Sequence, residues 1–576
     1  MMYTPPLAPL GGLWLSALVA ALPLLTVFVT LGLLRWKAHW AGLAGLVVAG
    51  VVAAVVYGMP VPLVALSASQ GFAFGLFPIM FIVLNAIWLY ELTVRSGRFE
   101  DLRRVIDSIS DDPRIQAIII AFGFGGLLEA LAGFGAPVAI TGVMLMAVGF
   151  SAMRAAVVVL LANTAPVAFG AIAIPIITAG NLTGIDYREI GAYVGHQTPL
   201  LAVFVPLFLV LLADGRRGVR ETWPAAVVVG VTFAVTQWVS ATWISVELTD
   251  IIASLAGIAS AVVLLRFWRP TGTAAARARV AGERGPEQAS AGTAGAGGNG
   301  ARPGRTGAGG APVVALADQP GTAVQKLPAG RVLLALFPYL LVIVVFSVAK
   351  LWAPVRTFLA STDMKLPWPG LDGHVLAASG KAATSTVYTF TWLSSAGTLL
   401  VFCGVIVALV YRVRLTEAAV LWGRTARKLR FSILTVGLVL ALAYVMNQSG
   451  QTITIGAALA ATGALFAFFS PILGWVGTAV TGSDTSANAL FATLQQTAAV
   501  RAGLDPTLLV AANTSGGVVG KMISPQNLAI AATAVGLVGR ESEIFRKLIW
   551  WSLGMLLALC LLVGLQSTVL SWMLPS

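Results

Sequence analysis

The stretch AANTSGGVVGKMISPQN, residues 511–527, places an Asn-Thr pair, two adjacent glycines, a lysine and a proline inside the last hydrophobic part of the chain. A second stretch, ANTAPVAFGAIAIP at residues 162–175, repeats its spacing. Asn163 and Asn513 are each followed directly by Thr, by Gly seven positions on and by Pro twelve positions on. Because these positions match in register, the two stretches predict a duplicated unit with one copy in each half of the chain.

The composition of the chain predicts an all-α polytopic membrane protein. Of its 576 residues, 58% are hydrophobic and 10% are charged, whereas soluble domains carry about 25% charged residues. A soluble surface could not cover so much apolar side chain, so the chain is expected to lie in a bilayer. Each span needs about 20 mostly apolar residues, which gives about 12–14 crossings. The apolar runs do not alternate with polar residues, which argues against a β-barrel.

The net charge of +13 comes from 36 Lys and Arg against 23 Asp and Glu. The basic residues fall between hydrophobic runs, for example at 35–37 and 95–104. This distribution is typical of cytoplasmic loops and does not indicate a nucleic-acid partner. The N-terminus has no basic region before the first apolar run, and Arg35 and Lys37 follow that run, so we expect an uncleaved first helix with its N-terminus outside.

Residues 270–330 differ from the rest of the chain because they are rich in Gly, Ala and Arg and almost lack large apolar side chains. Such a segment cannot bury enough surface to fold, and it is therefore predicted to be a disordered cytoplasmic linker. It separates an N-terminal membrane half, residues 1–269, from a C-terminal half, residues 331–576. Each half carries one hairpin and one Asn-Thr motif.

Both halves contain Gly and Pro where a membrane helix would be interrupted. Gly133 lies 30 residues before Asn163, and Gly482 lies 31 residues before Asn513. Backbone that leaves the helix at membrane depth survives only where protein buries it or where it lines a wet cavity. Paired interruptions therefore predict two repeat halves with interrupted or re-entrant helices at a substrate site, although the sequence does not say whether the copies are inverted. The predicted breaks are Gly133, Gly135, Pro137, Gly482, Gly516 and Gly517.

Two carboxyl groups are candidates for coupling transport to a proton. Glu129 lies in the middle of an apolar segment, where desolvation and nearby charges can make a carboxyl take and release a proton. The structural alternatives for Glu129 are an ion pair with a neighbouring helix and a position in water at a hairpin tip. Asp484 is surrounded by hydroxyls and an amide, so it is expected to join the coupling, to organise the site or to bind a cation.

Several polar side chains are candidates for binding a small organic anion. Lys521 would supply a fixed positive charge, or alternatively would snorkel from a helix end. The other candidates would donate hydrogen bonds to a carboxylate or hydroxyl, or alternatively would hold helices together. For His196 a structural hydrogen bond is favoured over proton relay. The hydrogen-bonding candidates are Asn163, Thr164, Ser483, Asn513, Thr514 and Ser515.

The sequence contains no HExxH, GxSxG or GxxxxGK[ST] motif, so neither an enzyme, a metal centre nor a cofactor is predicted. The alternatives to a proton-coupled transporter are a sodium-coupled transporter of another organic anion, with the ion at Asp484, and a channel lined by the polar breaks. A membrane enzyme is the third alternative.

Four blocks of the sequence resemble the signature regions of the L-lactate permease family. They are GLLEALAGFGAPVAI at 126–140, LANTAPVAFGAIAIPI at 161–176, TGSDTSANALFATLQ at 481–495 and AANTSGGVVGKMISPQN at 511–527. The resemblance implies proton-coupled import of L-lactate across a bacterial inner membrane, with glycolate or D-lactate as further substrates, and the outer side of the N-terminus is then the periplasm. A more distant resemblance to ion transporters with duplicated Asn-Thr hairpins implies an inverted repeat, a scaffold beside a transport domain, elevator motion and a homodimer.

A mechanism follows from the charge of such a substrate. Lactate is a monoanion, and an inside-negative membrane potential opposes its entry, whereas entry together with one proton moves no net charge. We expect Glu129 to carry the proton, Lys521 and the two Asn-Thr pairs to hold the carboxylate, and Asp484 to shape the second hairpin.

Overall fold

The computed structural model describes residues 2–133, 135–282, 328–376 and 383–575. Its regular structure is helical apart from β1 (Met364–Pro367) and β2 (Val387–Phe390), which pair antiparallel with Met364 opposite Phe390. The predicted all-α membrane class is confirmed. Within the described ranges, nine helical stretches are long and apolar enough to cross a membrane, and a bent pair of helices would make ten. Four shorter apolar helices add to these, so the number of crossings depends on how interrupted segments are counted.

The first part of the chain forms α1 to α6 with three π-helical segments between or within them. The elements are α1 (Leu13–Ala20), α2 (Leu22–Phe28), η1 (Val29–Leu33), α3 (Ala38–Val51), η2 (Val52–Val56), α4 (Val61–Phe74), η3 (Gly75–Met80), α5 (Phe81–Arg95) and α6 (Arg98–Asp107).

The next part contains the first predicted hairpin and the first Asn-Thr motif. The elements are α7 (Pro113–Ala117), η4 (Ile118–Phe124), α8 (Gly125–Ala132), α9 (Ala136–Val148), α10 (Ala152–Ala162), η5 (Val167–Phe169), α11 (Gly170–Thr183), α12 (Tyr187–Gly195), α13 (Thr198–Ala202), α14 (Val205–Val239), η6 (Ser240–Ile244), α15 (Thr249–Phe267) and α16 (Thr273–Gly282).

The part after the predicted linker contains both strands and the second copy. The helices are α18 (Ala329–Leu351), α19 (Ala353–Ser361), η8 (Thr384–Thr386), α20 (Ala396–Val410), α21 (Leu415–Ser449), α22 (Gln451–Ala460), α23 (Leu465–Thr481), α24 (Asp484–Ala502), α25 (Pro506–Lys521), α26 (Pro525–Ala534), α27 (Glu541–Gln566) and η9 (Ser571–Met573).

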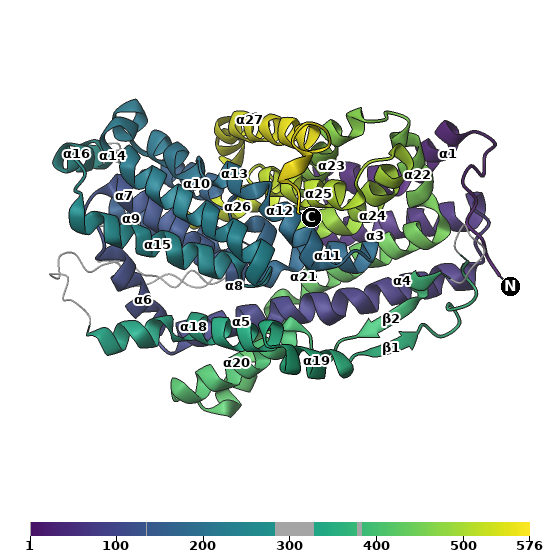
Figure 1. The fold of residues 1–576 in the computed structure, drawn as a ribbon, viewed down its shortest axis with the longest axis horizontal. Coiled ribbons are helices and arrows are strands. Elements are labelled where there is room, and N and C mark those ends of the chain that lie inside the picture. Colours follow the sequence, from purple (N-terminus) through teal and green to yellow (C-terminus); the bar gives the residue numbers. More distant parts are fainter. Residues whose placement is uncertain (1, 134, 283–327, 377–382, 576) are drawn as a thin grey trace, which may run out of the picture.

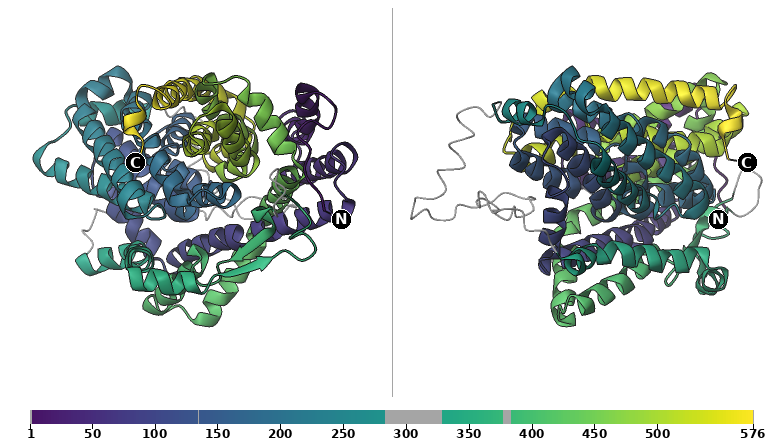
Figure 2. Two further views of the ribbon diagram at one scale, coloured as in Figure 1. Left: turned by 45° about the vertical axis from the view of Figure 1, so that its right-hand side comes forward. Right: turned by 60° about the vertical axis from the view of Figure 1, so that its left-hand side comes forward.

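The helices form a narrow layer and a larger block (Figure 1). The layer contains α4, α5, α18, α19 and α20 with the two strands, and the block contains α7 to α15 and α23 to α27. Figure 2 shows the same separation from two other directions, with α27 on the face of the block away from the layer. Helix α5 contacts α8 and α11, and the long α21 contacts α24, so these helices join the two parts.

Helices from the two halves of the sequence interleave inside the block. Helix α24 packs against α11, α25 packs against α12, and α26 packs against α9. The candidate site is therefore built at contacts between the two copies. This arrangement places residues that are more than 300 positions apart in the sequence within hydrogen-bonding distance.

The predicted linker differs from the structure at its beginning. Residues 283–327 lie outside the described residues, but the ten residues from Thr273 form α16. The physical reason is a set of ion pairs, because Arg279 donates to Asp214 at 2.6 Å and Arg277 lies 3.5 Å from Asp111. These contacts hold α16 against the break in α14 at Asp214 and against the residues that precede α7, so the helical part of the first half extends past residue 270.

Candidate functional site

A buried ion pair between the two halves of the chain forms the centre of the candidate site. Lys521 is the last residue of α25, and its Nζ donates to Oε1 of Glu129 on α8 at 2.6 Å. Asn163 donates from Nδ2 to the other carboxylate oxygen, Oε2, at 2.9 Å. The side chains of Lys521 and Glu129 are only 9% and 3% exposed. Three residues singled out from the sequence thus meet around one carboxylate.

The backbone around Glu129 explains how its carboxylate reaches this position. Helix α8 ends one turn later, where Gly133 leaves the helix and Gly135 adopts a positive φ of 85°. Gly170 leaves room for the side chain of Glu129, since a Cβ at residue 170 would lie 3.1 Å from Cγ of Glu129. The first predicted hairpin break is therefore a helix end in the structure, and Pro137 follows in the first turn of α9.

Asn163 is held at the end of an interrupted helix. It is the C-cap of α10, and the axis bends by 63° before the following helical stretch, Val167–Thr183. Three successive non-glycine residues, Ala171 to Ala173, have φ values of 46°, 61° and 56°. A left-handed backbone costs about 1–2 kcal/mol for each such residue, so the surrounding packing must hold this segment. Strained backbone of this kind is concentrated at functional sites and switches.

Asp484 lies at the second hairpin, where α23 ends at Gly482 with a positive φ of 77°. Its Oδ1 accepts from Thr478 at 3.4 Å, and its Oδ2 has no hydrogen-bond partner among the described residues. The carboxyl is 3% exposed and feels the charge of Lys521. Ser483 is the N-cap of α24 and accepts from the backbone of Ser486 at 3.3 Å, so its hydroxyl caps a helix.

The second Asn-Thr motif makes contacts of a different kind. Asn513 and Thr514 both donate to Oδ1 of Asn488, at 2.8 and 3.0 Å, and Ser515 donates to Oε1 of Gln197 at 2.7 Å. Each of these side chains is fully buried. They hold α24 and α25 together and tie α25 to the α12–α13 turn, as the helix-packing alternative describes. The hydroxyl of Thr164 in the first copy donates to the carbonyl of Leu161, in the last turn of α10, at 2.6 Å.

Gly516 and Gly517 are not helix breaks, which corrects the prediction made from the sequence. Helix α25 continues through both of them to Lys521. A Cβ at Gly516 would collide with the carbonyl of Pro471 on α23, and one at Gly517 would collide with the carboxyl of Asp484. The glycines therefore allow close helix packing, as small residues do in membrane proteins.

Sequence reasoning missed several buried polar residues beside the site. Asp250 and Gln237 bond to each other at 3.2 Å, and Glu247 pairs with Lys350 at 3.0 Å between the block and the layer. Asp250 and Glu247 stand just before an apolar run, where a carboxylate looks like a loop residue. These residues are distinguished by their burial and not by their residue type, and their burial could be known only from the fold.

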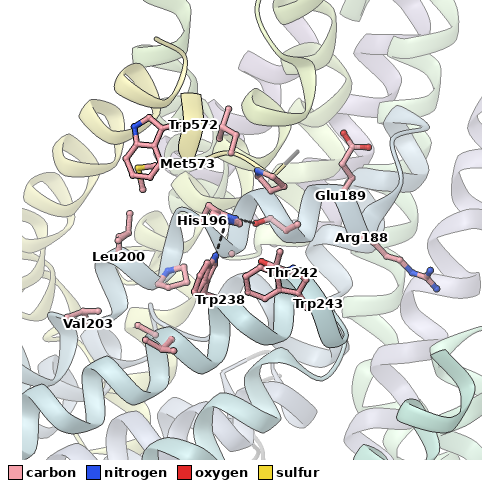
Figure 3. Close-up of a pocket in the computed structure, with 17 residues that line it drawn as sticks. Arg188, Glu189, His196, Leu200, Val203, Trp238, Thr242, Trp243, Trp572 and Met573 are labelled. Atoms are coloured by element: carbon pink, nitrogen blue, oxygen red, sulfur yellow. Dashed lines mark hydrogen bonds between the residues drawn. The ribbon is translucent and has the colours of Figure 1, made fainter. Parts of the chain in front are cut away.

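A pocket lined by α12 to α14 and the C-terminal residues is a different feature from this site. It has a volume of about 780 Å³ and is lined mainly by apolar and aromatic side chains, including Trp238, Trp243 and Trp572. Figure 3 shows His196 in this pocket, where its Nε2 accepts from Trp238 at 2.8 Å while its Nδ1 lies 2.7 Å from the carbonyl of Ala192. Both ring nitrogens are engaged, which agrees with a structural role for this histidine. In the described ranges no three His, Cys, Asp or Glu side chains are grouped as metal ligands.

Comparisons with known proteins cover nearly the whole chain. The family model described as L-lactate permease matches residues 16–570. The chain is 42% identical to the glycolate permease GlcA of Escherichia coli (strain K12), covering 99% of this chain and 98% of that protein. It is 40% identical to the L-lactate permease of Bacillus subtilis (strain 168), over all of both chains. It is also 40% identical to the L-lactate permease of Escherichia coli (strain K12), over 98% of each.

Among solved structures, the YdaH transporter of Alcanivorax borkumensis aligns with a TM-score of 0.44 and 12% identity. The alignment covers 88% of this chain and 89% of that one.

Proposed function

We propose, because this chain belongs to the L-lactate permease family, that it is a secondary transporter which imports L-lactate by proton symport. Glycolate and D-lactate are proposed as further substrates. Relatives that are 40% and 42% identical are named L-lactate permease and glycolate permease, which supports this substrate class. The observation that carries the proposal is the buried contact of the Glu129 carboxylate with Lys521 and Asn163.

This contact supports a carboxylate-binding site that the protein fills with its own carboxylate. Lys521 and Asn163 donate to the two oxygens of Glu129, and a substrate carboxylate offers the same two acceptors. Substrate that takes this position displaces Glu129 from its counter-charge. A buried carboxylate without a partner is strongly disfavoured, so Glu129 then takes a proton. Binding of the anion and binding of the proton are thereby linked.

The linkage matters because of the membrane potential. Moving one negative charge inward against 100 mV costs about 2.3 kcal/mol. Anion and proton together carry no charge, so the potential no longer opposes entry. An inward gradient of one pH unit then corresponds to about 1.4 kcal/mol and supports an accumulation ratio of about ten.

We place the protein in the inner membrane of a bacterial cell with its N-terminus on the periplasmic side. The N-terminus lies at the same end of the molecule as the two strands, and Tyr3 pairs with Val375 there. Helices α6 and α16 lie at the opposite end (Figure 1). The basic residues of α6 and the arginines of α16 support a cytoplasmic location for that end.

A sodium-coupled transporter is the second candidate, and one observation favours it. Oδ2 of Asp484 has no partner among the described residues, and Thr478 places a hydroxyl beside the same carboxyl. Oxygen atoms without partners are the groups that a bound cation would use.

Uptake of labelled L-lactate and of labelled glycolate into proteoliposomes containing the purified protein tests the proposal. A proton gradient is imposed in sodium-free buffer, and a protonophore is then added. Concentrative uptake that collapses with the protonophore supports proton symport. Uptake that appears only with a sodium gradient would show that transport is coupled to sodium and not to protons. Flux that does not concentrate the substrate under any gradient would indicate a channel.

A further inference from the structure

A cavity between the block and the layer contains charged side chains that the mechanism above does not use. Its volume is about 250 Å³. Helices α11 and α12 line it on the side of the block, and α18, α19 and the residues that follow β2 line it on the side of the layer. The cavity adjoins the two strands, so it lies toward the end of the molecule that carries the N-terminus (Figure 1).

Basic side chains reach this cavity from both sides. Arg188 comes from α12 of the block, while Lys350 and Arg356 come from α18 and α19 of the layer. Two carboxyl groups, those of Glu247 and Asp363, line the cavity as well. The basic groups therefore outnumber the acidic ones where the two parts of the molecule meet.

Both carboxyl groups already have partners in the protein. Glu247 is buried, pairs with Lys350 at 3.0 Å and accepts a hydrogen bond from the hydroxyl of Tyr187 at 2.8 Å. Asp363 accepts a hydrogen bond from the hydroxyl of Ser394. Lys350 is consequently neutralised by Glu247, and it keeps that carboxylate from competing for the two arginines.

The two arginines are not neutralised in this way. Arg188 and Arg356 are exposed, and neither forms an ion pair with a described residue. Arg188 lies over the ring of Tyr187, with its Cζ 5.8 Å from the ring centroid, and this contact orients the guanidinium without removing its charge. The nearby Asp186 caps α12 and accepts from the backbone N–H of Arg188 at 2.9 Å. A guanidinium binds a carboxylate through two parallel N–H donors, so each arginine can hold one.

The backbone and the hydroxyl groups of the cavity favour the same ligand. Helix α20 begins there, with Ser395 as its N-cap, and the N-terminus of a helix carries partial positive charge. Thr389 and Thr391 also line the cavity and have hydroxyls that can donate hydrogen bonds. A small anion with a carboxylate and a hydroxyl would find donors for both groups.

One helix connects the cavity with the central carboxylate. Ile177 and Asn181 of α11 line the cavity, and Gly170 at the start of this helix packs against the side chain of Glu129. Ile177 and Asn181 follow Gly170 by seven and eleven residues, which corresponds to about 10–16 Å along a helix. An anion in the cavity is thus close to the Glu129 site, on the side that faces the periplasm in the proposed orientation.

We propose that this cavity is an outer binding site for a small carboxylate, in which Arg188 and Arg356 capture the substrate before it reaches Lys521. The inference rests on the proposed import of lactate. A cleft lined by charge of the opposite sign raises the local concentration of an ion and increases its rate of association about tenfold or more. The site binds weakly, because both arginines remain in contact with water, and the anion can therefore move on to the central site.

Uptake by proteoliposomes at low and high ionic strength tests the proposal. Arg188→Gln with Arg356→Gln is expected to lower kcat/KM for L-lactate about tenfold in sodium-free medium at low salt, and each single variant about threefold. The value of kcat should not change, because the arginines act before the central site is reached. At about 0.5 M salt the wild type and the double variant should converge, since charges are then screened over a few ångströms.

Arg424→Gln is the matched control and should keep the wild-type kcat/KM at both salt concentrations. Arg424 is also exposed, but it lies in the first part of α21, which begins just after α20 ends and so lies toward the other end of the molecule. An unchanged kcat/KM in the double variant at low salt, or an equal loss in Arg424→Gln, would overturn the proposal. If the double variant loses kcat as well, Arg188→Lys with Arg356→Lys must restore the salt-dependent part of kcat/KM, and failure to do so overturns it too.

Chemical protection tests binding separately from transport. Phenylglyoxal modifies exposed arginines, and L-lactate is expected to slow the modification of Arg188 and Arg356 but not of Arg424, as measured by mass spectrometry. Chloride at the same ionic strength should give no protection. Equal protection by chloride, or no protection by lactate, would overturn the outer site. Protection without uptake of either lactate or glycolate by the wild type, under any gradient, would instead defeat the proposed function and not the carboxylate site.

Discussion

The two Asn-Thr motifs have the same spacing in the sequence but different structures. The first ends a helix at Asn163, and its amide contacts Glu129. The second lies inside the continuous helix α25, where Asn513 bonds to Asn488. The residues that follow explain the difference. Pro166 in the first copy has no N–H and restricts the residue before it, which breaks the helix.

In the second copy, Ser-Gly-Gly follows the Asn-Thr pair, and these small residues let α25 lie against the backbone of α23. A repeated polar motif in a membrane protein therefore does not have one function. One copy supplies a group to the buried charge pair, and the other fixes the helix that carries Lys521. The variants below test this division, starting with the largest expected effect.

Lys521→Gln is expected to reduce the initial rate of lactate uptake by at least about 100-fold. Removing one partner of a buried ion pair costs about 3–5 kcal/mol, and every 1.4 kcal/mol is about tenfold. Uptake of labelled lactate under a fixed pH gradient measures the effect. Lys547→Gln is the matched control, because Lys547 is an exposed lysine. Wild-type affinity and rate in Lys521→Gln would show that the second copy does not serve to position a counter-charge.

Gly516→Ala and Gly170→Ala place the same methyl group in the two copies. Gly516→Ala is expected to lower stability by about 1–3 kcal/mol, because the Cβ meets a backbone carbonyl of α23 that cannot move alone. Gly170→Ala presses on the side chain of Glu129, which can shift, so its main effect should be on lactate affinity. Thermal unfolding in detergent and equilibrium binding measure the two quantities. Equal loss of stability in both variants would contradict a structural difference between the copies.

Asn163→Ala and Asn513→Ala compare the roles of the two copies most directly, because one is expected to affect lactate binding and the other stability. Asn513→Ala removes two buried hydrogen bonds, the one that Asn513 donates to Asn488 and the one that it accepts from Gln495, at a cost of about 1–3 kcal/mol in stability. Asn163→Ala removes a donor from the carboxylate site and should weaken lactate binding with a smaller loss of stability. The same two assays apply. The division of roles fails if Asn513→Ala weakens binding and leaves the unfolding temperature unchanged.

Pro166→Ala should have the smallest effect. It returns a backbone N–H to the turn after Asn163, and the gain of a single net hydrogen bond is about 1 kcal/mol. Amide hydrogen exchange across residues 163–173 is expected to slow relative to the wild type, while exchange across 511–521 stays the same. Unchanged exchange in the first segment would mean that the interruption of the helix is maintained by packing around it and not by Pro166.

Much of the fold could be predicted from the sequence, because a bilayer leaves few choices for apolar runs of about 20 residues. The helix ends at Gly133 and Gly482 could also be found, since Gly is the residue that leaves a helix most easily. The contact of Glu129 with Lys521 could not be derived. It joins residues 392 positions apart, and neither residue carries a local sign of its partner.

The roles of Gly516 and Gly517 could not be predicted from the neighbouring sequence either, because they also depend on a distant helix. Glycine serves both as a helix break and as a place where helices approach closely, and only the position of α23 decides between the two. Asp250 shows the opposite failure. A carboxylate at the start of an apolar run is usually at the membrane surface, and the fold had to be known before its burial became visible.

The central claim is that substrate displaces Glu129 from Lys521 and that Glu129 then takes a proton. Proton uptake during titration of the purified protein with lactate, in weakly buffered detergent solution near neutral pH, tests this claim directly. By linkage, the account predicts uptake of about one proton for each lactate bound to the wild type and none for Glu129→Gln. Lactate binding to the wild type without proton uptake, or equal uptake in Glu129→Gln, would contradict it.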